Sequence, residues 1–216
     1  MQQCRYLVFD LDGTISDPAV GILRSLNYAL DRFGFPGVNE AEVSRFIGPP
    51  LDLTIREITG LTSDDEIAEL VRIYRERYGV AGYAENTLYP GIYETVRYLA
   101  SHDAPMGVCT SKRADFAEKI LEVFHIRNCF TFVSGGDIGI HKDEQLHILL
   151  EDNMIDTTAF MIGDRAIDIQ AAHAVGICSA GVLWGYGSKK ELLDASPEFI
   201  LEQPEQLKEW YISMNE

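Results

Sequence analysis

The chain has 216 residues, 46% of them hydrophobic, and a formal net charge of −16 at pH 7. This length and composition suffice for one or two domains with a sizeable core. The acidic balance disfavours a nucleic acid polymer as a partner, because both molecules would be polyanions. The sequence holds no apolar stretch typical of a membrane anchor or a signal peptide, so we expect no membrane partner.

The four cysteines, Cys4, Cys109, Cys129 and Cys178, lack the spacing of metal ligands. Three of them lie in or beside predicted core strands, where a small apolar thiol packs well. We therefore expect reduced thiols and a cytoplasmic protein.

The first predicted strand covers residues 6–9 and leads into Asp10-Leu11-Asp12-Gly13-Thr14. Such an apolar run is typical of a buried parallel strand, and ligands of open α/β sheets bind beyond the carboxyl ends of these strands. In an extended Asp-x-Asp both carboxylates point the same way and repel each other unless a cation or a shared proton compensates. The pair predicts either a divalent metal site or a nucleophile beside a general acid. The motif alone also fits a turn with an Asx cap.

A helical unit is predicted next. Its apolar residues recur at helical spacing in four stretches, residues 18–34, 40–46, 53–58 and 64–79. Asp17-Pro18 fits the start of the first helix, and Ser63 with Glu66 fits a capping box for the last. We place an inserted α-helical cap domain at residues 17–87, with the core formed by residues 1–16 and 88–216. Such a cap would close over the site, exclude water and select the substrate.

The interval 17–87 contains no lysine and seven arginines. One of them, Arg45, precedes Gly48-Pro49-Pro50, a loop that its prolines stiffen. Because arginine binds carboxylate and phosphate groups bidentately, Arg45, Gly48 and Pro49 are candidates for substrate specificity. The alternative is that Arg45 is a solvated surface residue and that the loop only connects two helices.

Two later strands also end in polar residues. One ends at Thr110, which Ser111 follows, and a hydroxyl at a strand end beside a helix N-terminus suits a phosphate. Another ends before Asp164, and Asp168 comes four residues later on the same face of the next helix. Lys142 begins a predicted helix between these segments. Considered alone, Thr110 could be a helix cap and Lys142 a surface lysine.

In order and spacing these motifs resemble those of the haloacid dehalogenase-like hydrolase superfamily, most closely its phosphoglycolate phosphatase-like branch. The superfamily's DxDGT motif matches Asp10 to Thr14, its strand-end Ser or Thr matches Thr110, its isolated Lys matches Lys142, and its GDxxxD motif matches residues 163–168. The resemblance covers essentially the whole chain. It implies an α/β fold, with a Rossmann-like, doubly wound parallel sheet as the core and an inserted α-helical cap domain.

The resemblance also implies a phosphomonoester hydrolase that works through an aspartyl-phosphate. Asp10 would be the nucleophile, and Asp12 would protonate the leaving alkoxide and then deprotonate the attacking water. Asp10, the backbone carbonyl of Asp12, and Asp164 would hold a Mg²⁺ cofactor.

The remaining matched residues would bind phosphate. Thr110 and the amides around Ser111 would hold it, and Lys142 would offset its charge. Asp168 would orient Lys142 or a metal-bound water. The chain departs from the branch at two positions, because Asp143 replaces the usual Pro after Lys142 and Arg165 replaces a small hydroxyl residue.

The branch favours a small phosphorylated metabolite, most of all 2-phosphoglycolate, as substrate. Nucleoside 5′-monophosphates are the alternative, because Phe46, Tyr83 and Tyr89 could stack a base if the cap turns them inward. A phosphomutase would use the same core, whereas a non-catalytic binding protein would normally lack Asp10, Asp12 or Asp164. No feature of the sequence predicts an oligomeric state.

Overall fold

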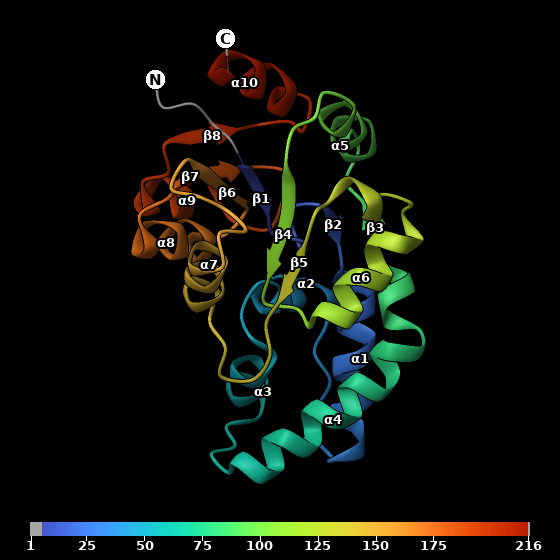
Figure 1. Ribbon diagram of the computed structural model, residues 1–216. Coiled ribbons are helices and arrows are strands. Elements are labelled where there is room, and N and C mark those ends of the chain that lie inside the picture. Colours follow the sequence, from blue (N-terminus) through green and yellow to red (C-terminus); the bar gives the residue numbers. More distant parts are fainter. Residues whose placement is uncertain (1–5, 216) are drawn as a thin grey trace.

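The computed structural model describes residues 6–215, and a six-stranded parallel sheet forms its centre (Figure 1). The strands are β1 (Tyr6–Phe9), β4 (Met106–Thr110), β5 (Val133–Gly135), β6 (Ala159–Gly163), β7 (Cys178–Val182) and β8 (Phe199–Leu201). Their order in the sheet is β5–β4–β1–β6–β7–β8, and every neighbouring pair is parallel.

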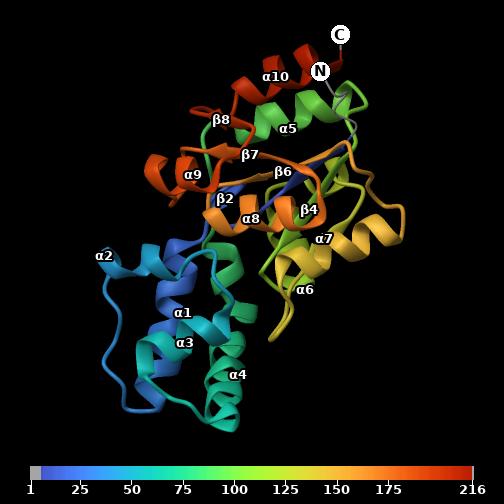
Figure 2. The ribbon, with the colours of Figure 1, turned by 90° about the vertical axis from the view of Figure 1, so that its left-hand side faces the viewer.

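Helices cover both faces of this sheet. They are α5 (Ile92–Ser101), α6 (Ala114–Val123), α7 (Lys142–Glu151), α8 (Ala166–Val175), α9 (Lys189–Ala195) and α10 (Gln206–Asn215). In the side view, α5 and α10 lie on one face, and α7 and α8 lie on the other (Figure 2). Within β1, Leu7 and Phe9 pack toward the first group and Val8 toward the second. Double coverage explains why β1 is apolar at consecutive positions rather than at every second one.

The direction of chain travel reverses at β1. From β1 the chain passes to β4 and β5 on one side and then returns to β6 on the other. At such a switch point the connections diverge and leave a crevice at the carboxyl ends of the strands. Asp10 follows β1, Thr110 ends β4, and Asp164 follows β6. The topology therefore brings the separate motifs to one edge and confirms the predicted doubly wound α/β fold.

A helical unit, residues 19–85, lies beyond this edge and fills the lower part of Figure 1. It consists of α1 (Ala19–Arg32), α2 (Glu40–Val43), the 3₁₀ turn Ser44–Phe46, α3 (Leu51–Thr59), α4 (Asp64–Val80) and the 3₁₀ turn Gly82–Glu85. The chain enters and leaves it through an antiparallel pair, β2 (Ser16–Asp17) with β3 (Thr87–Leu88). The unit has a core of its own, which packs on the sheet domain at Phe116 of α6. The division into domains at residues 17 and 88 stays a prediction.

Side chains cap the first and last long helices of this unit, α1 and α4, as the sequence predicts, except that one hydrogen bond of the predicted capping box is missing. Asp17 accepts a hydrogen bond from the Ala19 N–H at 2.9 Å, which supports the start of α1. Ser63 accepts the Glu66 N–H at 3.4 Å at the start of α4. In the described helix the Glu66 side chain does not return the bond, so only half of the predicted capping box forms. Glu66 lies in the solvent-exposed first turn, where its carboxylate is accessible to water.

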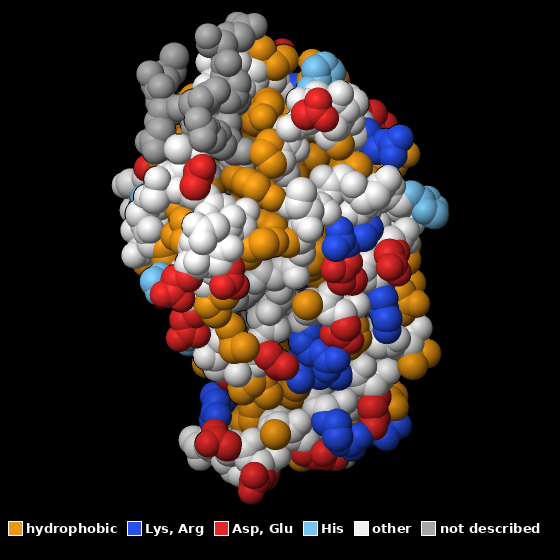
Figure 3. All heavy atoms as spheres, viewed as in Figure 1, with side chains coloured by type: hydrophobic (Ala, Val, Ile, Leu, Met, Phe, Trp, Pro, Cys, Tyr) orange, Lys and Arg blue, Asp and Glu red, His pale blue; other side chains and the backbone are white. Residues whose placement is uncertain are grey.

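Three features of the structure relate to the expectations from composition: the surface charge, the state of the cysteines and the length of the apolar helices. On the face shown in Figure 3, basic side chains are interspersed with acidic ones. Cys109, Cys129 and Cys178 are free thiols, while Cys4 lies outside the described residues. Between residues 6 and 215 we find no helix with the length and apolarity needed to cross a bilayer.

The packing of the helical unit can be tested at Gly21. A Cβ at this position of α1 would lie 2.2 Å from the carbonyl oxygen of Gly82. We expect Gly21→Ala to lower the free energy of unfolding by about 1–3 kcal/mol, although alanine is the better helix former. Denaturant unfolding measures the change, with Val20→Ala on the exposed face of α1 as the control. A stabilised Gly21→Ala protein would contradict the close approach of α1 to Gly82.

Candidate active site

The backbone after β1 fixes Asp10 and the turn that follows it. The Asp10 N–H donates to the Ile162 carbonyl of β6 at 2.9 Å, so the hydrogen bonding between these strands extends one residue past β1. The chain then turns through Gly13, which has φ = +88°. A Cβ at Gly13 would lie 2.3 Å from Asp164 Oδ2, so only glycine lets the turn pack this closely against that carboxylate.

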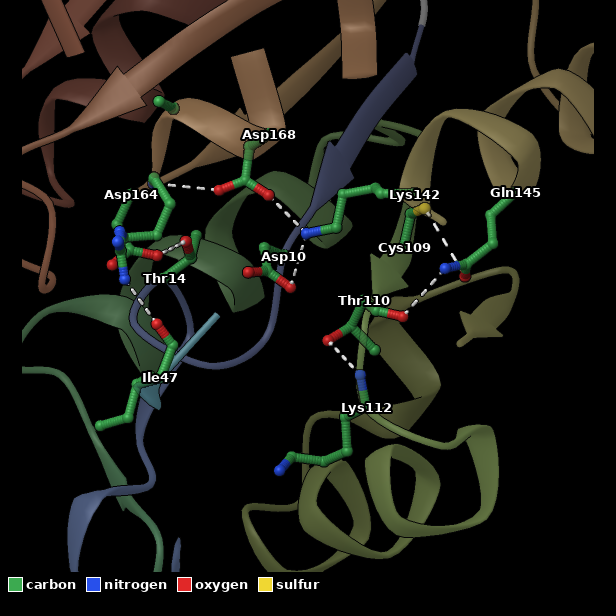
Figure 4. Close-up of polar contacts among 12 residues, drawn as sticks. Asp10, Thr14, Ile47, Cys109, Thr110, Lys112, Lys142, Gln145, Asp164 and Asp168 are labelled. Atoms are coloured by element: carbon green, nitrogen blue, oxygen red, sulfur yellow. Dashed lines mark hydrogen bonds and ion pairs between the residues drawn. The ribbon is translucent and has the colours of Figure 1, made fainter. Parts of the chain in front are cut away.

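Lys142 is the positive centre of the site. Its Nζ lies 3.1 Å from Asp10 Oδ1 and donates a hydrogen bond to Asp168 Oδ1 (Figure 4). All three side chains are buried. Burial by itself would lower the pKa of Lys142, but the charges of Asp10 and Asp168 outweigh this effect and raise it. Lys142 is therefore charged at neutral pH.

Asp143, which replaces the usual proline, lies where its charge stabilises a helix. Asp143 lies in the first turn of α7, directly after Lys142. A carboxylate at this end of a helix interacts favourably with the helix dipole.

The Asp168 carboxylate accepts hydrogen bonds from two groups. Besides accepting from Lys142, its Oδ2 accepts the Arg165 N–H at 3.0 Å and so caps α8. Burial raises the pKa of Asp168 to about 6, against the lowering effect of Lys142. The resemblance implies that Asp168 orients Lys142 or a metal-bound water, and the geometry brings Asp168 and Lys142 together.

Asp164 is held by groups on both sides. Its Oδ1 accepts the Thr14 hydroxyl at 3.3 Å, and its Oδ2 accepts the Tyr186 N–H at 2.8 Å. The hydroxyl of Tyr186 in turn donates to Asp17. Burial raises the pKa of Asp164 to about 7, and the charges of Asp168 and Asp10 add to this effect. A proton or a cation is therefore needed at this point.

The donor set fits a hard divalent cation. One oxygen each of Asp10, Asp164 and Asp168 lie within 4.8 Å of one another. Four buried carboxylates, counting Asp12, face the two ammonium groups of Lys142 and Lys112, so the formal charge of the six side chains is −2. Oxygen ligands and this charge suit Mg²⁺. The Asp12 side chain lies outside the cluster, and the predicted bond from its backbone carbonyl to the metal stays a prediction.

Asp12 points instead to a residue that the sequence analysis missed. Its Oδ2 pairs with Lys112 Nζ at 2.7 Å, and its Oδ1 has no hydrogen-bond partner within the described chain. Burial raises the pKa of Asp12, although Lys112 acts to lower it. Lys112 stands two residues after Thr110 in the same strand-end loop, and this position is the signal that could have identified it.

Thr110 and Ser111 lie beside these groups at the end of β4. The Thr110 hydroxyl accepts the Lys112 N–H at 3.3 Å, and the Thr110 carbonyl accepts from Gln145 Nε2 at 3.3 Å (Figure 4). These bonds fix the loop between β4 and α6. The Thr110 hydroxyl keeps its own proton for donation to a ligand.

A cavity of about 80 Å³ lies between the edge of the sheet and the helical unit. The core contributes Asp10, Asp12, Thr110, Ser111, Lys112 and Arg113 among others, and the helical unit contributes Phe46, Gly48, Pro49, Tyr74, Arg75 and Tyr78 among others. The cavity thus holds the nucleophile and acid candidates under a wall that is mostly apolar and includes three aromatic rings, those of Phe46, Tyr74 and Tyr78.

Arg45 does not line this cavity. Its side chain is 65% exposed and pairs with Glu57 of α3 at 2.6 Å, because the 3₁₀ turn directs it away from the sheet edge. Arg75 is the one helical-unit arginine on the described cavity wall, and it pairs with Asp137 of the core at 2.6 Å. Gly48 and Pro49 line the cavity as expected of a specificity loop. The predicted role of Arg45 has no support from its position.

Arg165 connects the core to the Gly48 loop. Its Nη1 donates to the Ile47 carbonyl at 2.6 Å, and its Nε donates to Glu191 at 2.9 Å. A Cβ at Gly48, which has φ = +105°, would lie 3.1 Å from Arg165 Cγ. The residue next to Asp164 therefore holds the loop over the cavity.

The raised pKa of Asp164 predicts a pH dependence of stability in metal-free protein. Its pKa is about 7 in the folded chain against 3.8 for a free aspartate, so the folded chain binds more protons in this window. Stability should therefore fall as pH rises from 4 to 8. We expect the fall to be smaller in Asp164→Asn, measured by denaturant unfolding in a chelator. The exposed Asp31→Asn removes the same charge and should keep the wild-type slope, whereas an unchanged slope in Asp164→Asn would contradict the assignment.

Comparisons with known proteins agree with this geometry. The family model described as haloacid dehalogenase-like hydrolase matches residues 7–182. The chain is 35% identical to a 5′-nucleotidase of Pseudomonas aeruginosa over 88% of each chain, and 29% identical to a phosphoglycolate phosphatase of Vibrio vulnificus over 95% of each. It superposes on the crystal structure of a predicted phosphatase from Clostridium acetobutylicum with a TM-score of 0.91 at 29% identity, covering 98% of this chain and 99% of that one. The chain belongs to the haloacid dehalogenase-like hydrolases, in their phosphoglycolate phosphatase-like branch.

Proposed function

We propose that this enzyme is a Mg²⁺-dependent phosphatase that hydrolyses small phosphate monoesters through an aspartyl-phosphate on Asp10. One observation carries the proposal. The Asp10 carboxylate stands at the end of the central strand and lines the cavity, and the ion-pair partner of its Oδ1 is the Lys142 ammonium. The positive charge of Lys142 lies 3.1 Å from this oxygen. A carboxylate that an ammonium group holds at the wall of a cavity is suited to attack phosphorus.

The phosphate would lie between Asp10, Thr110 and Lys142. The Thr110 hydroxyl and the amides around Ser111 would donate to its oxygens, and Lys142 would neutralise their charge. Phosphoryl transfer needs this positioning and charge neutralisation more than covalent chemistry. Asp168, which bonds the Lys142 ammonium, would keep that charge in place.

Asp12 is the proposed general acid and base. Burial raises its pKa, and this favours the protonated form needed to donate to the leaving alkoxide. Once the alkoxide has left, the same carboxylate can take a proton from the water that attacks the aspartyl-phosphate. Its free Oδ1 is available for both transfers.

Asp10 and Asp164, with Asp168 close by, would hold the Mg²⁺. When bound, the ion supplies Lewis-acid stabilisation of charge on the phosphate oxygens. The helical unit would act as the cap predicted for residues 17–87. Its contacts with Arg165 and Lys112 support a closed arrangement that excludes water from the reaction.

A small ester such as 2-phosphoglycolate is the favoured substrate. The cavity volume of about 80 Å³ is well below the ~300–1,000 Å³ of pockets for drug-sized ligands. A nucleoside 5′-monophosphate is the second candidate, because one relative is named a 5′-nucleotidase and Phe46 lines the cavity. Tyr83 and Tyr89, the other two predicted stacking residues, do not line it. The free thiols of Cys109, Cys129 and Cys178 support a reducing, cytoplasmic location.

Phosphate release tests the proposal. We expect turnover of 2-phosphoglycolate in Mg²⁺, and a loss of at least about 10³-fold in Asp10→Asn, because the amide cannot form the aspartyl-phosphate. Removal of Mg²⁺ by a chelator should abolish turnover, and its return should restore it. Nucleoside monophosphates and sugar phosphates in the same panel identify the preferred ester.

The exposed Asp31→Asn serves as the matched control and should keep wild-type turnover. A phosphomutase would instead give isomerised product with little free phosphate. If folded Asp10→Asn protein keeps wild-type activity, the aspartyl-phosphate mechanism is wrong. If the wild type releases no phosphate from any ester, the phosphatase assignment is wrong.

A further inference from the structure

Lys112 is a buried cation with one donor to spare. Its side chain is 7% exposed and lines the cavity. The ammonium has three N–H donors. Within the described chain, one pairs with Asp12 at 2.7 Å and one donates to the Tyr78 hydroxyl at 2.9 Å. The third has no protein acceptor among these contacts, and an unmet donor on a buried charge is costly unless a ligand meets it.

The helical unit contributes a second spare donor at the same point. Tyr78 is fully buried in α4, and its hydroxyl oxygen accepts hydrogen bonds from Lys112 and from Asn86 Nδ2 at 3.2 Å. Both bonds use the oxygen lone pairs, so the phenolic proton remains available for donation. Tyr78 also lines the cavity. An N–H from the core and an O–H from the helical unit therefore converge on one small volume.

The position of Lys112 relative to Asp12 defines what such a pair can bind. As the proposed acid, Asp12 must come within hydrogen-bond reach of the leaving-group oxygen. Lys112 Nζ lies 2.7 Å from Asp12 Oδ2, and the other oxygen of this carboxylate would reach the leaving group, so the ammonium is within about 8 Å of the leaving-group oxygen. A group bound by Lys112 must therefore lie close to the ester oxygen, on the leaving-group side.

The phosphate has its own donors elsewhere. Lys142 lies on the opposite side of Asp10, toward Asp168, while the Lys112 side chain extends away from both toward the helical unit (Figure 4). The two ammonium groups thus serve different parts of a ligand. Lys142 faces the phosphate, and Lys112 faces what the phosphate is attached to.

We infer that Lys112 and Tyr78 bind a carboxylate of the leaving group, so that the enzyme selects phosphate esters that carry a carboxylate near the ester oxygen. This inference rests on the proposed function and names its substrate class. A carboxylate accepts both donors at once, which a neutral alkyl group cannot do. The anion-binding role that the sequence predicts for Arg45, on the surface of the helical unit, is thereby assigned to Lys112 in the core.

The test compares 2-phosphoglycolate with ethyl phosphate, which has the same two carbons but no carboxylate. We expect the wild type to favour 2-phosphoglycolate in kcat/KM by at least about 10-fold. Lys112→Met should reduce this preference by about 10- to 100-fold, and Tyr78→Phe by about 5-fold. If Lys112→Met acted only through Asp12, kcat/KM would fall equally for both esters, and the ratio of the two values would stay unchanged. Lys119→Met, in α6, removes the same charge and should keep the wild-type ratio.

A binding measurement separates this inference from the proposed function. Calorimetric titration of Asp10→Asn protein in Mg²⁺ needs no turnover, and we expect 2-phosphoglycolate to bind at least about 10-fold more tightly than ethyl phosphate. Lys112→Met in the same background should remove the difference. Equal binding of the two esters, no binding of 2-phosphoglycolate, or an unchanged preference in Lys112→Met would overturn the inference. Absence of turnover in the wild type would overturn only the proposed function.

Discussion

The site depends on the compensation of negative charge that the fold concentrates at one point. Asp10, Asp164 and Asp168 are carried to the same sheet edge by two neighbouring strands and a helix, and all three are buried. Lys142 lies among them because α7 starts beside this edge. One ammonium among several carboxylates reduces the repulsion without removing it, and the remaining charge creates the demand for a metal ion. Stability of the empty site and affinity for the ion are therefore set by the same groups.

Much of this could be predicted from local sequence. Buried strands are recognisable as apolar runs, and the carboxyl ends of parallel strands meet, so the pattern of residues suffices to place Asp10, Thr110 and Asp164 together. Lys142 and Asp168 followed from the family's motif spacing. The α/β fold and the main helices of the inserted unit followed from periodicity. These residues share one property: the backbone of a regular element fixes their position.

The long side chains could not be predicted in the same way. Arg45, Lys112 and Arg165 each lie in or beside a recognisable motif, but their charged ends lie several bonds from the backbone. Packing decides that Arg45 turns to Glu57 at the surface, while Arg165 reaches Ile47 and Lys112 reaches a tyrosine of the helical unit. Such contacts join segments far apart in the chain. Motif spacing carries no information about them.

Tyr186 links the sheet edge that carries Asp164 to the segment through which the chain enters the helical unit. Its backbone N–H holds Asp164, and its hydroxyl holds Asp17, where the chain enters the helical unit. Any swing of that unit about residues 16–17 must pull on Tyr186, and through it on the carboxylate at the sheet edge. Opening of the helical unit would thus be coupled, through Tyr186, to the carboxylate of the candidate metal site.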